Sequence, residues 1–186
     1  MYGMVNKALE EMVVERFGED MWDRIRDEAG VDVDVFISNE GYPDEVTYGL
    51  VSAASVILGQ PVPKLLEAFG VHWVLRTARE GYGDLMDANG RTLQEFLLNL
   101  PNFHTRVSLI FPHLQPPRFV CTDMTGHSLR LHYHSHRAGL APFVRGLLDG
   151  LSQMFETPLT VEQEADRAAG ADHDIFLLRW ARSTTA

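Results

Sequence analysis

The sequence predicts an α+β fold, in which an N-terminal helical lobe is followed by a lobe that joins helices to a four-stranded antiparallel sheet. Two observations support this class. Before Pro112, apolar residues recur every three or four positions through several long segments, which is the period of an amphipathic helix. After Pro117, apolar and polar residues alternate in four short runs, which is the period of a half-buried strand.

Residues that start, stop or interrupt helices frame the segments of helical period. Asp44 is predicted to cap the third helix, and Thr92 with Glu95 forms a capping box for a later one. Pro101 lacks a backbone N–H and is expected to kink or restart its helix. We therefore expect helices over residues 1–17, 19–29, 44–58, 63–79, 92–111 and 139–155. Glycine-rich residues 80–90 are predicted to be a connection with at most one helical turn.

The four alternating runs predict two hairpins. They cover residues 118–123, 128–136, 159–165 and 175–180. Turn signals at Gly126 and Gly170 separate the members of each pair. The helix over 139–155 lies between the hairpins in the chain and is expected to cross the sheet. Residues 182–186 are expected to form a frayed end.

Composition excludes several classes of protein. A chain of 186 residues with 45% hydrophobic residues can bury the core of one domain. The net charge of −10 argues against nucleic acid or an anionic membrane as the main partner. The single cysteine, Cys121, excludes an intrachain disulfide, fits a reducing cytosol and is expected to be a buried strand residue. No secretory signal is present and no apolar run approaches the roughly 20 residues of a membrane span. We expect a cytoplasmic protein without membrane insertion.

The strand that begins at Ser128 carries one chemically unusual face. Alternation places five residues on it: Leu129, Leu131, Tyr133, Ser135 and Arg137. The stripe begins apolar and ends in a phenol, a hydroxyl and a guanidinium, all of which donate hydrogen bonds. Such a surface suits an apolar object with an anionic edge.

The opposite face of the same strand is rich in histidine. It carries Ser128, Arg130, His132, His134 and His136. The three imidazoles could bind zinc, copper or iron, and a non-haem metal protein built on them is one alternative. Arg130 on the same face and the lack of a nearby carboxylate argue against it, so solvated histidines are the default.

One further histidine stands apart. His104 lies in the helix after Pro101, among apolar neighbours, where a histidine is usually a core residue satisfied by one hydrogen bond. The chain has no nucleotide-binding glycine loop, no Cys-x-x-Cys and no Gly-x-Ser-x-Gly motif. No catalytic constellation is visible, and we do not expect an enzyme.

A helical histidine, a strand that ends in anion-binding donors and an apolar helical lobe together suggest a haem. The sequence resembles the H-NOX (haem nitric oxide/oxygen-binding) family, which includes stand-alone bacterial sensors and is related to the haem domain of soluble guanylate cyclase. The matching motifs are residues 1–8, 44–48, 80–83, Asn102-Phe103-His104, Phe111-Pro112, Pro116-Pro117, Tyr133-x-Ser135-x-Arg137 and 172–176.

The resemblance implies one haem-binding domain over residues 1–181, with a distal helical lobe over about 1–60 and a proximal lobe over about 61–181. Haem b lies enclosed between them, with His104 as the proximal iron ligand. Tyr133, Ser135 and Arg137 match the clamp on the haem propionates, and Pro117 matches the proline that distorts the porphyrin. Positions around the distal pocket are matched by Val5, Leu9, Trp73, Phe143 and Leu147.

The residue at position 143 is expected to select the gas. Oxygen-binding members of the family carry a distal tyrosine there, and Phe143 cannot donate a hydrogen bond. The resemblance therefore implies a nitric oxide sensor that also binds CO, and an oxygen sensor that uses the Trp73 indole is the alternative. Nitric oxide is expected to break the bond between iron and His104. The chain shows no output module, so a histidine kinase or a diguanylate cyclase/phosphodiesterase is the expected partner.

Overall fold

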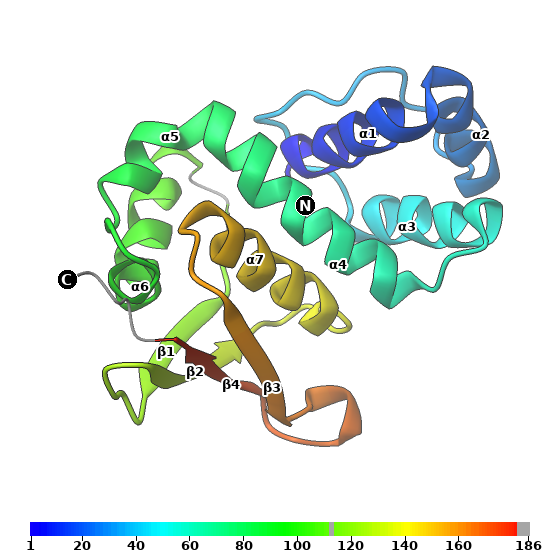
Figure 1. Cartoon of the computed structure of the whole chain (residues 1–186). Helices are drawn as coiled ribbons and strands as arrows, with labels where there is room; N and C mark the ends of the chain where they lie inside the picture. Colours follow the sequence, from blue (N-terminus) through cyan, green and yellow to red (C-terminus); the bar gives the residue numbers. More distant parts are fainter. Residues whose placement is uncertain (112–113, 182–186) are drawn as a thin grey trace. The chain divides into compact units, whose positions relative to one another are not determined.

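The computed structural model describes residues 1–111 and 114–181, and its elements confirm the predicted α+β class (Figure 1). The chain divides into two compact units, Met1–Phe69 and the part that begins at Gly70. The helical segments are α1 (Gly3–Phe17), α2 (Glu19–Ala29), α3 (Asp44–Leu58), α4 (Val62–His72), the π-helical η1 (Trp73–Ala78), α5 (Arg79–Asp87), α6 (Leu93–Ile110), α7 (Ala141–Met154) and the 3-10 turn η2 (Arg167–Ala169). The strands are β1 (Arg118–Thr122), β2 (Ser128–His134), β3 (Leu159–Ala165) and β4 (Asp174–Trp180).

The first unit packs α2 against both α1 and α3. Gly30 ends α2 in the left-handed conformation that glycine adopts without steric cost. Asp44 was predicted to cap α3, but Pro43 holds the cap position. The Asp44 carboxylate instead accepts from the N-terminal ammonium of Met1 at 2.6 Å, which fixes the start of the chain beside α3.

Within the second unit, the four strands form one antiparallel sheet in the order β1-β2-β4-β3. The two hairpins predicted from the sequence are thus joined through the β2–β4 pair. α7 lies across one face of this sheet, and α6 lies beside β1 (Figure 1). The predicted bounds of the four strands and of α6 and α7 each lie within two residues of the observed bounds.

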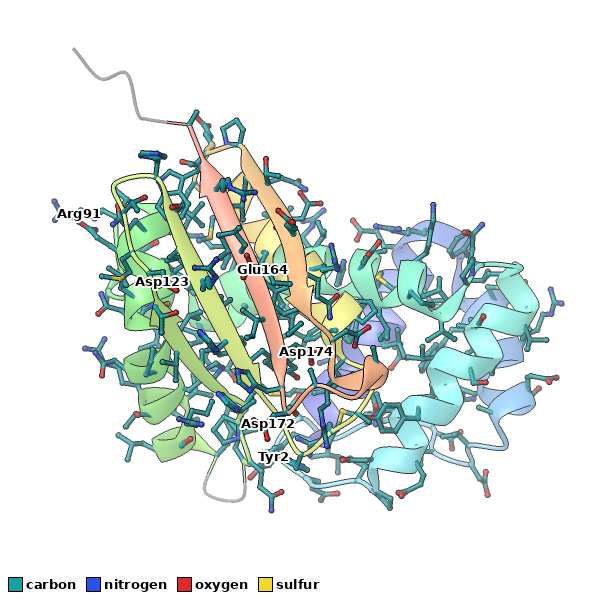
Figure 2. The ribbon with its side chains drawn as sticks, turned by 90° about the horizontal axis from the view of Figure 1, so that it is seen from below. Tyr2, Arg91, Asp123, Glu164, Asp172 and Asp174 are labelled. Atoms are coloured by element: carbon teal, nitrogen blue, oxygen red, sulfur yellow. The ribbon has the colours of Figure 1, made fainter. Side chains whose placement is uncertain are left out.

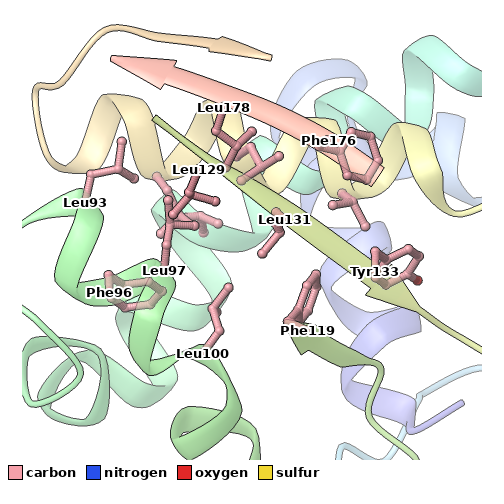
Figure 3. Close-up of a cluster of buried hydrophobic side chains, with 14 of the residues drawn as sticks. Leu93, Phe96, Leu97, Leu100, Phe119, Leu129, Leu131, Tyr133, Phe176 and Leu178 are labelled. Atoms are coloured by element: carbon pink, nitrogen blue, oxygen red, sulfur yellow. The ribbon is translucent and has the colours of Figure 1, made fainter. Parts of the chain in front are cut away.

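The core of the second unit lies between the inner face of the sheet and these two helices. Its buried members come from η1, α5, α6, α7, β1, β2 and β4. Figure 3 labels those of α6, β1, β2 and β4. The labelled residues are Leu93, Phe96, Leu97, Leu100, Phe119, Leu129, Leu131, Tyr133, Phe176 and Leu178. β2 alternates between buried and half-buried residues along its whole length, so the inner stripe assigned from the sequence is confirmed for Leu129, Leu131 and Tyr133.

Two helical predictions were wrong for the same reason. Residues 79–87 form α5, interrupted only by the non-helical backbone of Tyr82, although glycines predicted a connection. α6 continues through Pro101 without a restart. In both places tertiary packing offsets a poor local preference, because Met86 and Leu100 are buried in the core.

Among the described residues, no single helix is long and apolar enough to cross a membrane. The segments α3 and Val62–Asp87 pass that test only when taken together as a bent pair.

Two glycines allow close approach between helices of the second unit. A Cβ atom on Gly70 would lie 2.4 Å from the carbonyl oxygen of Phe143 and 2.6 Å from the backbone nitrogen of Leu147. A Cβ atom on Gly150 would lie 2.8 Å from Cβ of Val74. All three distances are shorter than packed atoms tolerate, so Gly70 brings α4 into backbone contact with α7, and Gly150 lets the backbone of α7 approach the Val74 side chain of η1.

Gly70→Ala is expected to lower the free energy of unfolding by roughly 1–3 kcal/mol, since the obstructing atoms belong to backbone and cannot rotate away. The matched control is Gly49→Ala within α3, where the nearest atom would be 3.9 Å away. That control should stabilise the protein by about 0.5–1 kcal/mol. Urea unfolding followed by circular dichroism measures both. A Gly70→Ala protein as stable as the parent would mean that these helices can separate at no cost.

Candidate functional site

His104 lies on α6 between aromatic side chains. Its imidazole stacks on the ring of Phe119 from β1, with centroids 5.5 Å apart and an interplanar angle of 13°. The ring of Phe103 meets it edge-on at 6.0 Å. The imidazole is half-buried. α6 and β1 therefore present one histidine within an aromatic surface, at the edge of the core.

The protonation of His104 follows from these surroundings. Burial lowers the pKa of its imidazole to about 4, and the Leu100 carbonyl one turn earlier offsets part of this effect. The Nδ1 atom is buried, and within residues 1–111 and 114–181 no group meets it with hydrogen-bond geometry. A neutral imidazole with a buried nitrogen that lacks a hydrogen-bond partner is chemically ready to serve as a metal ligand.

Tyr133 joins this aromatic surface from the neighbouring strand. It stands opposite Phe119 in the β1–β2 register, and the two ring centroids lie 5.3 Å apart. Figure 3 labels both side chains. Tyr133 is buried. Imidazole, phenyl and phenol rings thus follow one another from α6 across β1 to β2.

Ser135 and Arg137 were predicted to lie on the strand, but β2 ends at His134. They lie in the loop that follows, where the backbone N–H of Arg137 donates to Oγ of Ser135 at 3.1 Å. The Arg137 guanidinium donates to the Gln115 carbonyl at 3.3 Å. This bond brings Arg137 to the segment before β1 that also contains Pro117, which is half-buried.

Arg167 organises this loop and was not identified from the sequence. Its guanidinium donates to the carbonyl oxygens of Ser135 at 2.8 Å and of Arg137 at 3.3 Å. Its backbone N–H in turn donates to the buried carboxylate of Asp174 at 3.1 Å, which also accepts from Gln163 at 3.0 Å. No local pattern marks Arg167, since its role depends on the distant pairing of β2 with β4.

A second group of predicted residues meets on η1 and α7. The rings of Trp73 and Phe143 lie 6.4 Å apart, edge to face. Leu147 follows Phe143 by one helical turn on α7 and shares its face. All three are half-buried. The remaining two predicted pocket residues, Val5 and Leu9, lie on α1 of the first unit, where Leu9 is buried and Val5 half-buried.

The histidine face of β2 differs from its prediction. His136 lies beyond the strand and is exposed, so it does not align with His132 and His134. The expectation that no carboxylate lies nearby was wrong: Arg130 pairs with both Asp123 and Glu164. Figure 2 labels these two acids on the sheet.

Cys121 is half-buried, and its thiol is directed to the Leu97 carbonyl at 3.6 Å. Burial raises its pKa to about 11, so the thiol stays protonated and is a poor nucleophile.

The family model described as haem-NO-binding matches residues 2–163. The chain belongs to the haem-NO-binding (H-NOX) family.

Curated relatives agree with this assignment. Soluble guanylate cyclase gcy-31 of Caenorhabditis elegans is 29% identical over 163 residues, which are 87% of this chain and 23% of that protein. Soluble guanylate cyclase gcy-35 of the same organism is 26% identical over 190 residues, which cover 96% of this chain and 27% of that protein. The chain thus spans about a quarter of the length of these relatives.

Solved H-NOX structures share the fold. An H-NOX protein from Shewanella oneidensis in the Fe(II)NO ligation state superimposes with a TM-score of 0.90 at 21% identity, over 97% of this chain and 99% of that one. An unliganded Fe(II) H-NOX protein from K. algicida gives a TM-score of 0.87 at 22% identity, over the whole of both chains. H-NOX proteins form a family of haem-based gas sensor domains.

The residues of this chain fit the family's cofactor. An iron atom needs a neutral imidazole, and His104 has one. A porphyrin needs a flat apolar surface, and Phe103 and Phe119 flank that imidazole. Propionates need hydrogen-bond donors, and Arg137 supplies a guanidinium near the end of β2.

Arg167→Met is expected to loosen the loop that contains Ser135 and Arg137. Loss of about 1 kcal/mol of hydrogen bonding should speed exchange of the Arg137 backbone amide roughly fivefold. Hydrogen–deuterium exchange resolved at this amide measures the effect. Arg179→Met, which removes an exposed ion pair with Glu162 elsewhere on the sheet, is the control and should leave the rate unchanged. Equal exchange in parent and Arg167→Met would show that the loop holds itself without Arg167.

Proposed function

We propose that this domain is a haem-based nitric oxide sensor with His104 as the protein ligand to iron. The observation that carries the proposal is the state of His104: a neutral imidazole, flanked by aromatic rings, whose buried Nδ1 meets no hydrogen-bond partner among the described residues. Haem b, when bound, would supply a ferrous iron able to take nitric oxide or CO as a ligand.

Tyr133, Ser135 and Arg137 are proposed to hold the haem propionates. Arg137 offers a planar guanidinium that matches a carboxylate in two hydrogen bonds. Its carbonyl and that of Ser135 are held by Arg167, so the loop is shaped before any ligand arrives. Pro117, close in sequence to the Gln115 carbonyl that Arg137 contacts, is proposed to press on the porphyrin face.

Phe143 is proposed to set the choice of gas. A polar iron-bound dioxygen gains from a nearby donor by roughly 1.5–3 kcal/mol, and a phenyl ring gives none. Nitric oxide on ferrous iron is less polarised and does not depend on such a donor. Trp73 is in edge contact with Phe143 and carries an indole N–H, which is the specific observation that favours oxygen binding as the second candidate function. Leu147 is proposed to add an apolar side chain beside Phe143 in the distal pocket.

His104 is also proposed to be the switch. While it binds iron, α6 is tethered to the cofactor; when nitric oxide breaks that bond, α6 is released and can shift against β1. His104 would have two discrete states, bound to iron and released from it, and nitric oxide would shift the equilibrium between them. The proposed recipient is a histidine kinase or a diguanylate cyclase/phosphodiesterase.

The absorption spectrum of the reduced protein tests ligand choice. Under argon, air, CO and nitric oxide in turn, we expect stable CO and nitric oxide complexes and no lasting oxygen complex. Phe143→Tyr should introduce oxygen binding, because its hydroxyl supplies the missing donor. Phe143→Leu is the control and should bind gases as the parent does. A stable oxygen complex in the parent would favour Trp73 as the donor, and a protein without a haem spectrum would refute the proposal.

Arg137→Ala is expected to raise the rate of haem transfer to apomyoglobin at least roughly tenfold, since a propionate loses a charge-assisted pair worth about 1.5–3 kcal/mol. The control replaces His132, His134 and His136 by glutamine and should leave haem retention unchanged. Haem retention equal to the parent in Arg137→Ala would exclude Arg137 from the clamp. Loss of haem in the triple variant would place the propionates on the histidine face instead.

A further inference from the structure

The outer face of the sheet carries a histidine cluster that the haem site does not use. The β2–β4 register pairs Tyr133 with Asp174, so the next residues outward, His134 and His173, come opposite one another at the end of the sheet. Their rings stack with centroids 3.9 Å apart. Asp172 lies near this end of the sheet in Figure 2.

Hydrogen bonds link the cluster into a chain of four side chains. Asp172 Oδ2 lies 2.9 Å from Nδ1 of His173. Nε2 of His173 lies 2.8 Å from Nδ1 of His132, and Nε2 of His132 lies 2.9 Å from Oγ1 of Thr122.

The carboxylate fixes the first link of this chain, because Asp172 only accepts and Nδ1 of His173 donates to it. The Thr122 hydroxyl donates to Oδ2 of Asp123 at 3.4 Å and also lies beside Nε2 of His132. The tautomers of His132 and His173 set the direction of the other two links. In this arrangement a proton occupies the position between Asp172 and His173.

We infer that His134, Asp172 and His173 form a binding site for a divalent zinc-type cation. Each of the three offers one ligand atom, and these atoms all lie within 4.8 Å of one another, in the one such group among the described residues. Two imidazoles with a carboxylate form a ligand set that zinc accepts, and water completes the tetrahedron.

The cation takes the place of the proton between Asp172 and His173. Their present separation of 2.9 Å is close to the about 3.3 Å between two ligand atoms on one tetrahedral zinc. With the cation at Nδ1 of His173, Nε2 of this imidazole carries the proton and donates to Nδ1 of His132. His132 then donates from Nε2 to Thr122. The partners that orient a metal-bound imidazole are thus already in position.

The charges around the cluster permit a cation. Burial lowers the pKa of both His132 and His134, and the neighbouring His173 lowers them further. Arg130 lies on the same face, but its charge is offset by Glu164 at 2.6 Å and Asp123 at 2.8 Å. Arg118 lies opposite His134 in the β1–β2 register. Its positive charge repels a cation, so we expect the affinity for zinc to be moderate.

Titration of the haem-loaded protein with zinc chloride in a calorimeter tests the site. We expect one saturable zinc per chain, no binding of Mg²⁺, which prefers oxygen ligands, and no change in the haem spectrum. His134→Gln, Asp172→Asn and His173→Gln should each weaken zinc binding at least roughly tenfold, and His132→Phe by a similar factor through loss of orientation. The matched control His136→Gln, on an exposed histidine outside the cluster, should bind as the parent does.

Proton positions give a second readout. In ¹⁵N spectra of the imidazoles, zinc should remove the proton from Nδ1 of His173 and leave one on its Nε2 in the same titration. Undiminished zinc affinity in an Asp172→Asn/His173→Gln double variant, or no saturable binding by the parent, would overturn the inference. The Arg137→Ala protein should still bind zinc, so failure of this site and failure of the proposed haem site are distinguishable.

Discussion

The pairing of β2 with β4 is the constraint on which the second unit depends. Among the described residues it is the one strand pair that joins the two hairpins in the order β1-β2-β4-β3, and its register assigns each residue of β2 to a face. Leu131 then meets Phe176 in the core, while His132 meets Ile175 outside. A slip of one residue would bury the histidines and expose the apolar stripe, which no packing could offset.

Much of this arrangement follows from local pattern. Alternation and turn residues locate all four strands, and the apolar period places α3 and α7 close to their observed bounds. What local pattern misses depends on partners far along the chain. α6 continues through Pro101 because Leu97 and Leu100 are buried in the core. Burial of one face stabilises a helix that lacks one backbone hydrogen bond.

The candidate site shows the same division. His104 and Tyr133 could be singled out from residue type, period and family resemblance. The loop position of Ser135 and Arg137 could not, because alternation does not say where a strand ends. Arg167 and His173 could not be found either, since both join β2 only through the β2–β4 register. Long-range pairing, not residue chemistry, was the missing information.

The π-helical segment η1 determines how the helix after Trp73 must be compared between proteins. A π turn holds about one residue more than an α turn, so a helix without it is one residue shorter over the same path. Successive residues of an α-helix are rotated by about 100° about its axis. A sequence comparison that runs through this segment without a gap therefore assigns the wrong side chain to the position beside α7. Trp73 contacts Phe143 and Val74 lies close to Gly150 at the start of η1, so an offset of one residue that began here would change which side chains are compared after Val74.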